Sequence, residues 1–132
     1  MNIINKYEIF FEPFVERHFI KTFAKKYKGA WDVTFSSLKE EFTFFDVLFN
    51  KSIAETIIDS KEIKICKTEF KISGTQESRH GSGDRCIVAI HKNTNKICVL
   101  LVYNKNDLSN SNETAVWKKL IKGNYLEYLD IF

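Results

Sequence analysis

The alternation of hydrophobic and polar positions predicts helices in the first half of the chain and strands in the second. Residues 7–11 (YEIFF) form a short apolar run typical of a strand, which stops at Glu12 and Pro13. After Pro13, large apolar side chains recur every four residues as far as Tyr27, while lysines occupy other positions. This spacing predicts an amphipathic helix that starts at the proline, and Gly29 is typical of its end.

A second apolar stripe begins at Trp31. Large apolar side chains follow it at spacings of three or four residues as far as Phe49. The stripe predicts one continuous helix that pairs with the first as an antiparallel helical hairpin. Residues 52–60 are ambiguous, and we interpret them as a further helical turn.

The pattern then changes to strands. Three strands are predicted at 63–72, 85–91 and 96–105, with a glycine-containing mobile loop at 73–84, a hairpin turn at 92–95 and a last helix at 113–122. The apolar run 97–103 is typical of a central strand that is covered on both faces.

This order of elements predicts an α+β fold. An N-terminal helical hairpin packs on a small, mainly antiparallel sheet, and a C-terminal helix follows. The opposite face of the sheet is expected to be open and to carry Lys67 and Lys71. The length of 132 residues fits a single domain spanning residues 1–132.

Composition places the chain among folded proteins. Hydrophobic residues make up 44% and charged residues 28%, which excludes a disordered or collagen-like chain. No apolar run approaches the roughly 20 residues of a membrane helix, and the N-terminus does not resemble a signal peptide. Three cysteines without an export signal are expected to be reduced thiols, so we expect a cytoplasmic protein with no membrane partner.

The net charge of +3 is unevenly distributed along the sequence. Residues 61–92 hold seven Lys or Arg and four Asp or Glu, whereas residues 1–60 hold eight and nine. The predicted strands and loop of the middle segment therefore carry the positive excess. Such a region attracts phosphate, although chance alone can produce a bias of this size.

Two groups of residues in this segment are candidates for phosphate chemistry. Lys67, Glu69 and Lys71 alternate along one strand and so share a face, where two ammonium groups flank a carboxylate. The alternative is a solvated strand surface with an ion pair. The second group lies in the loop before the next strand, where Arg79 and His80 precede Arg85.

The loop residues have different possible roles. Two guanidinium groups among small residues can hold phosphate, and a histidine can transfer a proton near neutral pH. The alternative is an ordinary polar loop. The sequence has no Walker loop, and the neighbouring Ser, His and Asp of this loop do not predict a catalytic triad.

Further along, Tyr103 and Lys105 share a face at the end of the third strand, where a base can stack and a phosphate can bind. Lys64 adds a cation on the first of the three strands. The alternative for Tyr103 is a residue at the rim of the core. Neither the cysteines nor the histidines have metal-ligand spacing, so no metal and no cofactor are predicted.

From Lys67 to about Tyr125 the sequence resembles the RelE/ParE superfamily of toxins from type II toxin–antitoxin systems. The segments that carry the resemblance are CKTEFKISG (66–74), SGDRCIVAI (82–90), KICVLLVYNKND (96–107) and ETAVWKKLIK (113–122). The preceding helical hairpin fits the order of elements in that superfamily.

The resemblance implies a compact α+β toxin with a concave basic surface. In the RelE branch this surface cuts mRNA on the ribosome without metal, through attack of the 2′-OH on the adjacent phosphate. By position it implies catalytic roles for Lys67, Lys71, Arg85 and Lys105, with His80 as a substitute for a proton-transferring residue near the C-terminus. RNA-binding roles are expected for Lys64, Arg79 and Tyr103.

The implied partners are a cognate antitoxin protein, mRNA and the ribosome. Two other functions stay open at this point. One is a ParE-like inhibitor of DNA gyrase, which has no nuclease chemistry. The other is a non-catalytic toxin-like module that only binds a protein partner, for which the basic residues have no catalytic role.

Overall fold

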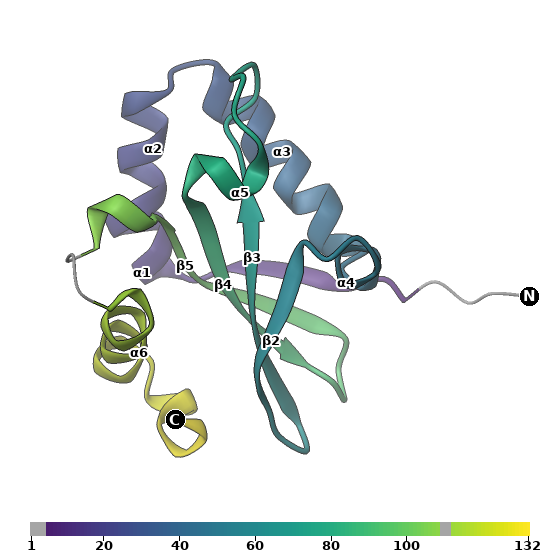
Figure 1. The fold of residues 1–132 in the computed structure, drawn as a ribbon. Helices are drawn as coiled ribbons and strands as arrows, with labels where there is room; N and C mark the ends of the chain where they lie inside the picture. Colours follow the sequence, from purple (N-terminus) through teal and green to yellow (C-terminus); the bar gives the residue numbers. More distant parts are fainter. Residues whose placement is uncertain (1–4, 109–111) are drawn as a thin grey trace, which may run out of the picture.

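The computed structural model describes residues 5–108 and 112–132, which form one five-stranded sheet with helices on both faces (Figure 1). The strands are β1 (Glu8–Phe11), β2 (Ala54–Asp59), β3 (Ile63–Phe70), β4 (Asp84–His91) and β5 (Lys96–Asn104). Their order across the sheet is β1-β5-β4-β3-β2. The strands from β2 to β5 lie side by side in the sheet in the order in which they follow one another in the sequence. Consecutive strands are usually neighbours in this way.

The sheet is mainly antiparallel, as predicted. β2 to β5 pair antiparallel in succession, whereas β1 pairs parallel to β5 with Glu8 opposite Lys96. β5 therefore lies between two strands, and most of its side chains are buried. This position explains the apolar run that the sequence shows there.

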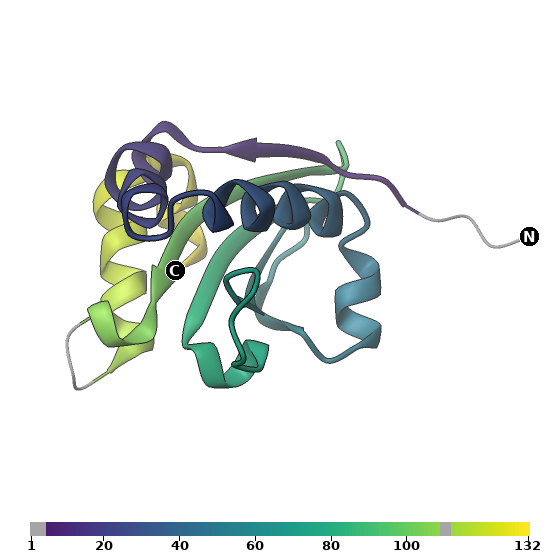
Figure 2. The ribbon, with the colours of Figure 1, turned by 90° about the horizontal axis from the view of Figure 1, so that it is seen from above.

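A helical layer covers one face of the sheet (Figure 2). It consists of α1 (Pro13–Val15), the π-helical segment η1 (Glu16–Ile20), α2 (Lys21–Lys26), α3 (Ala30–Thr43) and α4 (Asp46–Asn50). Pro13 occupies the first turn, as predicted, and Gly29 takes a positive φ of 79° between α2 and α3. Aromatic residues from both helices, including Phe23 and Trp31, are buried against the sheet.

The opposite face of the sheet is not open, which corrects the prediction. α6 (Glu113–Asn124) and the 3-10 segment η3 (Leu126–Ile131) pack over it and bury Trp117, Ile121 and Tyr128. These residues contact apolar side chains of β3, β4 and β5 such as Ile87. Because both faces of the central strands are apolar, both require a covering layer. Near the N-terminus of α6 this face carries a cleft.

Two other local predictions are wrong. The predicted long helix breaks at residues 44–45, where Phe45 turns into the core and the shorter α4 begins. Residues 52–60 do not form a helical turn but contain β2, the edge strand that pairs with β3. Within the described residues, no helix is both long enough and apolar enough to cross a membrane.

Candidate functional site

The site begins with a row of side chains across three strands. Glu69 of β3 pairs in register with Arg85 of β4, which in turn pairs with Tyr103 of β5. Paired residues on adjacent strands point to the same face, so the three side chains lie together on the face that α6 covers. Lys67 lies two residues before Glu69 on β3 and therefore shares this face.

A short helix lies beside this row, within the segment that the sequence predicted to be a mobile loop. α5 (Arg79–Ser82) begins at Ser78, whose hydroxyl accepts a hydrogen bond of 2.9 Å from the Gly81 amide. It ends at Gly83, which takes a left-handed φ of 77°. The buried Ser82 hydroxyl lies 2.5 Å from the Phe70 carbonyl and accepts a hydrogen bond from the Asp84 amide. These contacts attach α5 to β3 and β4.

Arg79, for which the sequence predicts RNA binding, joins α5 to the helical layer. Its two terminal nitrogens lie 3.0 and 2.5 Å from the carboxylate oxygens of Glu41 on α3. The hydrogen bond to Glu41 raises the pKa of Arg79. A bidentate pair of this kind is geometrically specific, so it fixes Arg79, and with it the neighbouring His80, relative to α3.

Arg85 is buried, with 4% of its side chain exposed. Its guanidinium donates hydrogen bonds to the backbone carbonyls of Asp84 (3.0 Å), His80 (3.1 Å) and Arg79 (3.4 Å). It also forms an ion pair of 3.1 Å with Glu69. Its donors are therefore largely used inside the protein, and Arg85 fixes α5 and Glu69 relative to the sheet.

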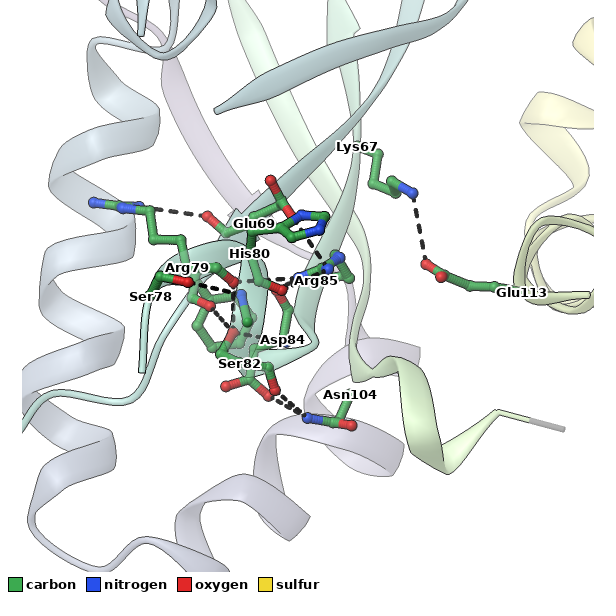
Figure 3. Close-up of polar contacts among 12 residues, drawn as sticks. Lys67, Glu69, Ser78, Arg79, His80, Ser82, Asp84, Arg85, Asn104 and Glu113 are labelled. Atoms are coloured by element: carbon green, nitrogen blue, oxygen red, sulfur yellow. Dashed lines mark hydrogen bonds and ion pairs between the residues drawn. The ribbon is translucent and has the colours of Figure 1, made fainter. Parts of the chain in front are cut away.

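Glu69 is the central residue of the cluster (Figure 3). The same carboxylate oxygen lies 2.7 Å from Nδ1 of His80 and 3.1 Å from the Arg85 guanidinium. His80 is 83% exposed, so the rest of its ring faces solvent. The buried Arg85 thus orients a carboxylate, and the carboxylate orients an accessible imidazole.

A second carboxylate, Glu113, faces the row from the first turn of α6. Its Oε2 accepts a hydrogen bond of 2.6 Å from the Tyr103 hydroxyl and lies 3.7 Å from the Lys67 ammonium. Figure 3 shows Lys67 directed toward Glu113. Tyr103 is buried, and burial together with this hydrogen bond raises its pKa. A buried ring offers no face for a base, so Tyr103 does not provide the stacking surface that the sequence suggested.

These residues surround a cleft of about 260 Å³, whose lining consists of Ser52, Ile53, Glu55, Lys67, Glu69, His80, Arg85, Lys105 and Glu113. Four of the five residues predicted to be catalytic therefore come together. The lining holds three Lys or Arg and three Glu. With His80 neutral, the formal charges of the cleft therefore sum to zero. This corrects the expectation of a concave surface that is basic.

Two predicted residues lie elsewhere. Lys71 follows the end of β3 and lines a separate cavity of about 200 Å³ beside α3. The Lys64 ammonium lies 4.8 Å from the centre of the Phe49 ring, which packs with the core of the helical layer. Lys64 is thus on the opposite face of the sheet from Lys67, as expected for an odd spacing along a strand.

The sequence pattern predicts Glu69 only as a carboxylate between two lysines, and it indicates no part for Glu113 or Glu55. Strand register was the missing information for Glu69, because its partner is Arg85 rather than the flanking lysines. The partner of Lys67 comes from α6, and nothing in the local pattern indicates that contact. Among the residues that the structure describes, no group of three or more His, Cys, Asp or Glu side chains is arranged to hold a metal ion.

Comparison with known proteins gives the class of fold. No family model matches the chain, and no curated protein matches it. The fold is RelE-like: it matches the crystal structure of an archaeal RelE–RelB complex from Pyrococcus horikoshii OT3 with a TM-score of 0.55 at 11% identity. The match covers 77% of this chain and 98% of that chain. The resemblance noted in the sequence is therefore confirmed at the level of the fold.

Proposed function

We propose that the protein is the toxin of a type II toxin–antitoxin pair and that it cuts RNA at the cleft described above. The RelE-like fold supports the class of protein. The observation that carries the nuclease activity is the Glu69 carboxylate, which contacts both an exposed imidazole and a buried guanidinium. A carboxylate and an imidazole held in contact can act as general base and general acid, which are the groups that accelerate attack of a 2′-hydroxyl on the adjacent phosphate.

In the proposed reaction, Glu69 accepts the proton of a ribose 2′-hydroxyl. The 2′-oxygen then attacks the adjacent phosphorus, and the bond from phosphorus to the 5′-oxygen of the next nucleotide breaks. Protonated His80 donates its proton to that leaving oxygen. The products are a 2′,3′-cyclic phosphate and a 5′-hydroxyl, and a later proton exchange with water restores both side chains.

The cations of the cleft have separate roles. Lys67 and Lys105 can reach a phosphate, because Lys105 is exposed and, among residues 5–108 and 112–132, Lys67 has a single ion pair, the 3.7 Å contact with Glu113. They stabilise the charge that develops on the phosphate oxygens. Arg85 acts as a positioning residue through Glu69, since its own donors face backbone carbonyls. When RNA binds, a phosphate replaces Glu113 as the partner of Lys67.

The partners follow from the same cleft. One solved structure with a similar fold is a RelE–RelB complex, and we propose an antitoxin protein that covers the cleft of this chain and keeps RNA out. The substrate is mRNA, and the ribosome presents it in the cytoplasm. A carboxylate-bearing segment of the antitoxin can pair with Lys67 and Lys105 in the same way as Glu113 pairs with Lys67 here.

The test uses expression of the intact chain in cells that lack the antitoxin, followed by mapping of mRNA 5′ ends. The expected result is new cuts within translated regions that carry 5′-hydroxyl ends. Glu69→Gln and His80→Ala are each expected to reduce cutting about 10²–10⁴-fold, the usual contribution of an acid–base group. Lys71→Ala is the matched control, because Lys71 lies in a different cavity. Undiminished cutting by Glu69→Gln contradicts the assignment.

One observation favours a second candidate function. Three carboxylates line the cleft and Arg85 is buried, an arrangement that also suits a surface for binding a protein, as in a gyrase inhibitor or a non-catalytic module. For a gyrase inhibitor, expression produces DNA-damage signalling without cut mRNA. For a non-catalytic module, expression produces neither effect.

A further inference from the structure

The outer surface of the first helix is strongly basic. Residues 13–29 contain five Lys or Arg and one Glu, a net charge of +4. The whole chain has 20 Lys or Arg and 17 Asp or Glu, so the rest of the chain has 15 and 16, a net charge of −1. This one helical segment therefore carries more than the entire positive excess of the protein.

Three of these cations form a row, which we call the basic stripe: Arg17 of η1 with Lys21 and Lys25 of α2. They are spaced four residues apart, so they lie on one side of the helix over a length of about 12 Å. All three are exposed, and Lys28 is exposed in the turn that follows. The helix lies at the edge of the helical layer (Figure 1).

The charges of the basic stripe are not neutralised within the protein. None of its three residues forms an ion pair with any residue in the described part of the chain. By contrast, Lys67, Arg79, Arg85 and Lys92 each have a carboxylate partner. Four like charges along one short surface repel one another, so a polyanion that binds there is favoured by electrostatic attraction.

We propose that the basic stripe binds the phosphate backbone of double-stranded RNA. The same helix turns its large apolar residues inward, with Val15 and Phe23 buried in the core. The three residues of the stripe therefore offer neither a ring for unpaired bases nor an apolar anchor, and the exposed ring of the neighbouring His18 packs against Phe14 with 4.8 Å between the ring centres. Phosphate contacts need neither, and double-stranded RNA is recognised mainly by shape and backbone.

Two other polyanionic partners fit the surface less well. A helix that lies in a membrane surface must insert an apolar face, but none of the exposed large apolar side chains of the described chain belongs to α1, η1 or α2. Specific protein interfaces depend on central aromatic or aliphatic anchors, which the stripe lacks. Backbone phosphates require only the cations themselves.

The stripe lies on the helical layer, whereas the cleft lies on the face that α6 covers. It is therefore a second RNA-contacting surface that does not overlap with the cleft. This inference deepens the proposed function by adding a structured RNA, such as a ribosomal helix, to the RNA that is cut. The binding of RNA by the basic stripe can be measured without any cleavage, so this inference can be tested separately from the nuclease activity.

The test measures binding of the intact chain to a 20-base-pair RNA duplex by fluorescence anisotropy at several salt concentrations. One variant combines Arg17→Glu, Lys21→Glu and Lys25→Glu. The matched control combines Lys61→Glu, Lys119→Glu and Lys122→Glu, which are exposed elsewhere and change the net charge equally. Thermal melting of both variants confirms that each is folded.

The stripe variant is expected to bind roughly 10- to several-hundred-fold more weakly at 0.1 M salt, with a salt slope smaller by about 2.7, because each phosphate contact contributes about 0.9. The control is expected to stay within about 3-fold of the wild type. Equal losses in both variants, or no binding by the wild type, overturn the proposal. So does stripe-dependent binding to anionic vesicles or to an acidic protein when RNA binding is unchanged. Absence of RNA cutting refutes the proposed function but leaves a stripe-dependent affinity intact.

Discussion

Replacement of Arg85 tests whether this residue is mainly part of the scaffold. The guanidinium is 4% exposed and contacts three backbone carbonyls and the Glu69 carboxylate. Arg85→Ala leaves all four acceptors without this donor. We therefore expect a large loss in the free energy of unfolding in addition to any effect on RNA cleavage.

The magnitude follows from the partners that are lost. Removing one member of a buried ion pair typically costs 3–5 kcal/mol, because the remaining charge is left uncompensated. Glu69 is 23% exposed and keeps His80 as a neighbour, so water and the imidazole relieve part of this cost. The three backbone carbonyls lose a charged donor as well, but water that enters the space left by the guanidinium can donate to them and offsets most of this second loss. We expect a loss of about 3 kcal/mol for Arg85→Ala and a smaller loss for Arg85→Lys, which retains the charge but not the planar fork.

Urea denaturation followed by tryptophan fluorescence is a suitable assay, because Trp31 and Trp117 are both buried and lie on opposite faces of the sheet. Lys105→Ala is the control, since Lys105 lines the same cleft but is exposed, and a change within about 0.5 kcal/mol is expected. A loss of less than about 1 kcal/mol for Arg85→Ala would refute the reasoning, because the guanidinium would then be free to contact RNA directly.

Three further predictions concern neighbouring residues. Lys67→Ala is expected to reduce RNA cleavage about 10²-fold or more through loss of a phosphate contact, whereas Lys71→Ala has little effect; single-turnover rates on a short RNA compare the two. Burial raises the pKa of the Asp84 carboxyl in the folded state. The contribution of this group to the free energy of unfolding is therefore largest below its ordinary pKa and is lost as the pH rises through the raised pKa. Asp84→Asn is therefore expected to unfold at a higher urea concentration than the wild type at pH 7, with a difference that shrinks in acid; an unchanged difference across this range contradicts the assignment. Gly83→Ala is expected to lower the melting temperature by destabilising the fold about 1–2 kcal/mol, because φ is 77° there and a Cβ atom meets Lys105 at 3.2 Å; an unaltered melting temperature would count against the described turn.

Much of the fold is predictable from the sequence because its elements have clean periodicity. The side chains of β3 alternate between apolar and polar, whereas β4 and β5 contain continuous apolar runs, and these patterns match their burial. Pro13 marks the start of the first helix. β2 was not predicted, because an irregularity between Thr56 and Ile58 interrupts its alternation. The break before α4 also has no signal, since Phe45 fits the helical stripe on either side of the turn.

The candidate site is less predictable, because its contacts join distant positions in the sequence. Residue type correctly suggested that Lys67, Arg85 and Lys105 share a surface, and they line one cleft. Pattern alone does not show that Arg85 is buried beneath α5 or that Glu113 reaches Lys67 from α6. Each of these contacts depends on how the chain returns to the sheet after a loop or helix.

The parallel pairing of β1 with β5 has a consequence for biosynthesis. Glu8 lies opposite Lys96, so the first strand pairs with a strand that lies 88 residues further along the sequence. Glu113, the first residue of α6, lies later still in the sequence. Contacts between residues this distant in sequence form slowly, and this one requires that Lys96 has already been synthesised. During synthesis the cleft therefore stays incomplete until α6 has been made, because Lys105 and Glu113 line it, and the RNA cleavage that we propose is expected to begin only after that point.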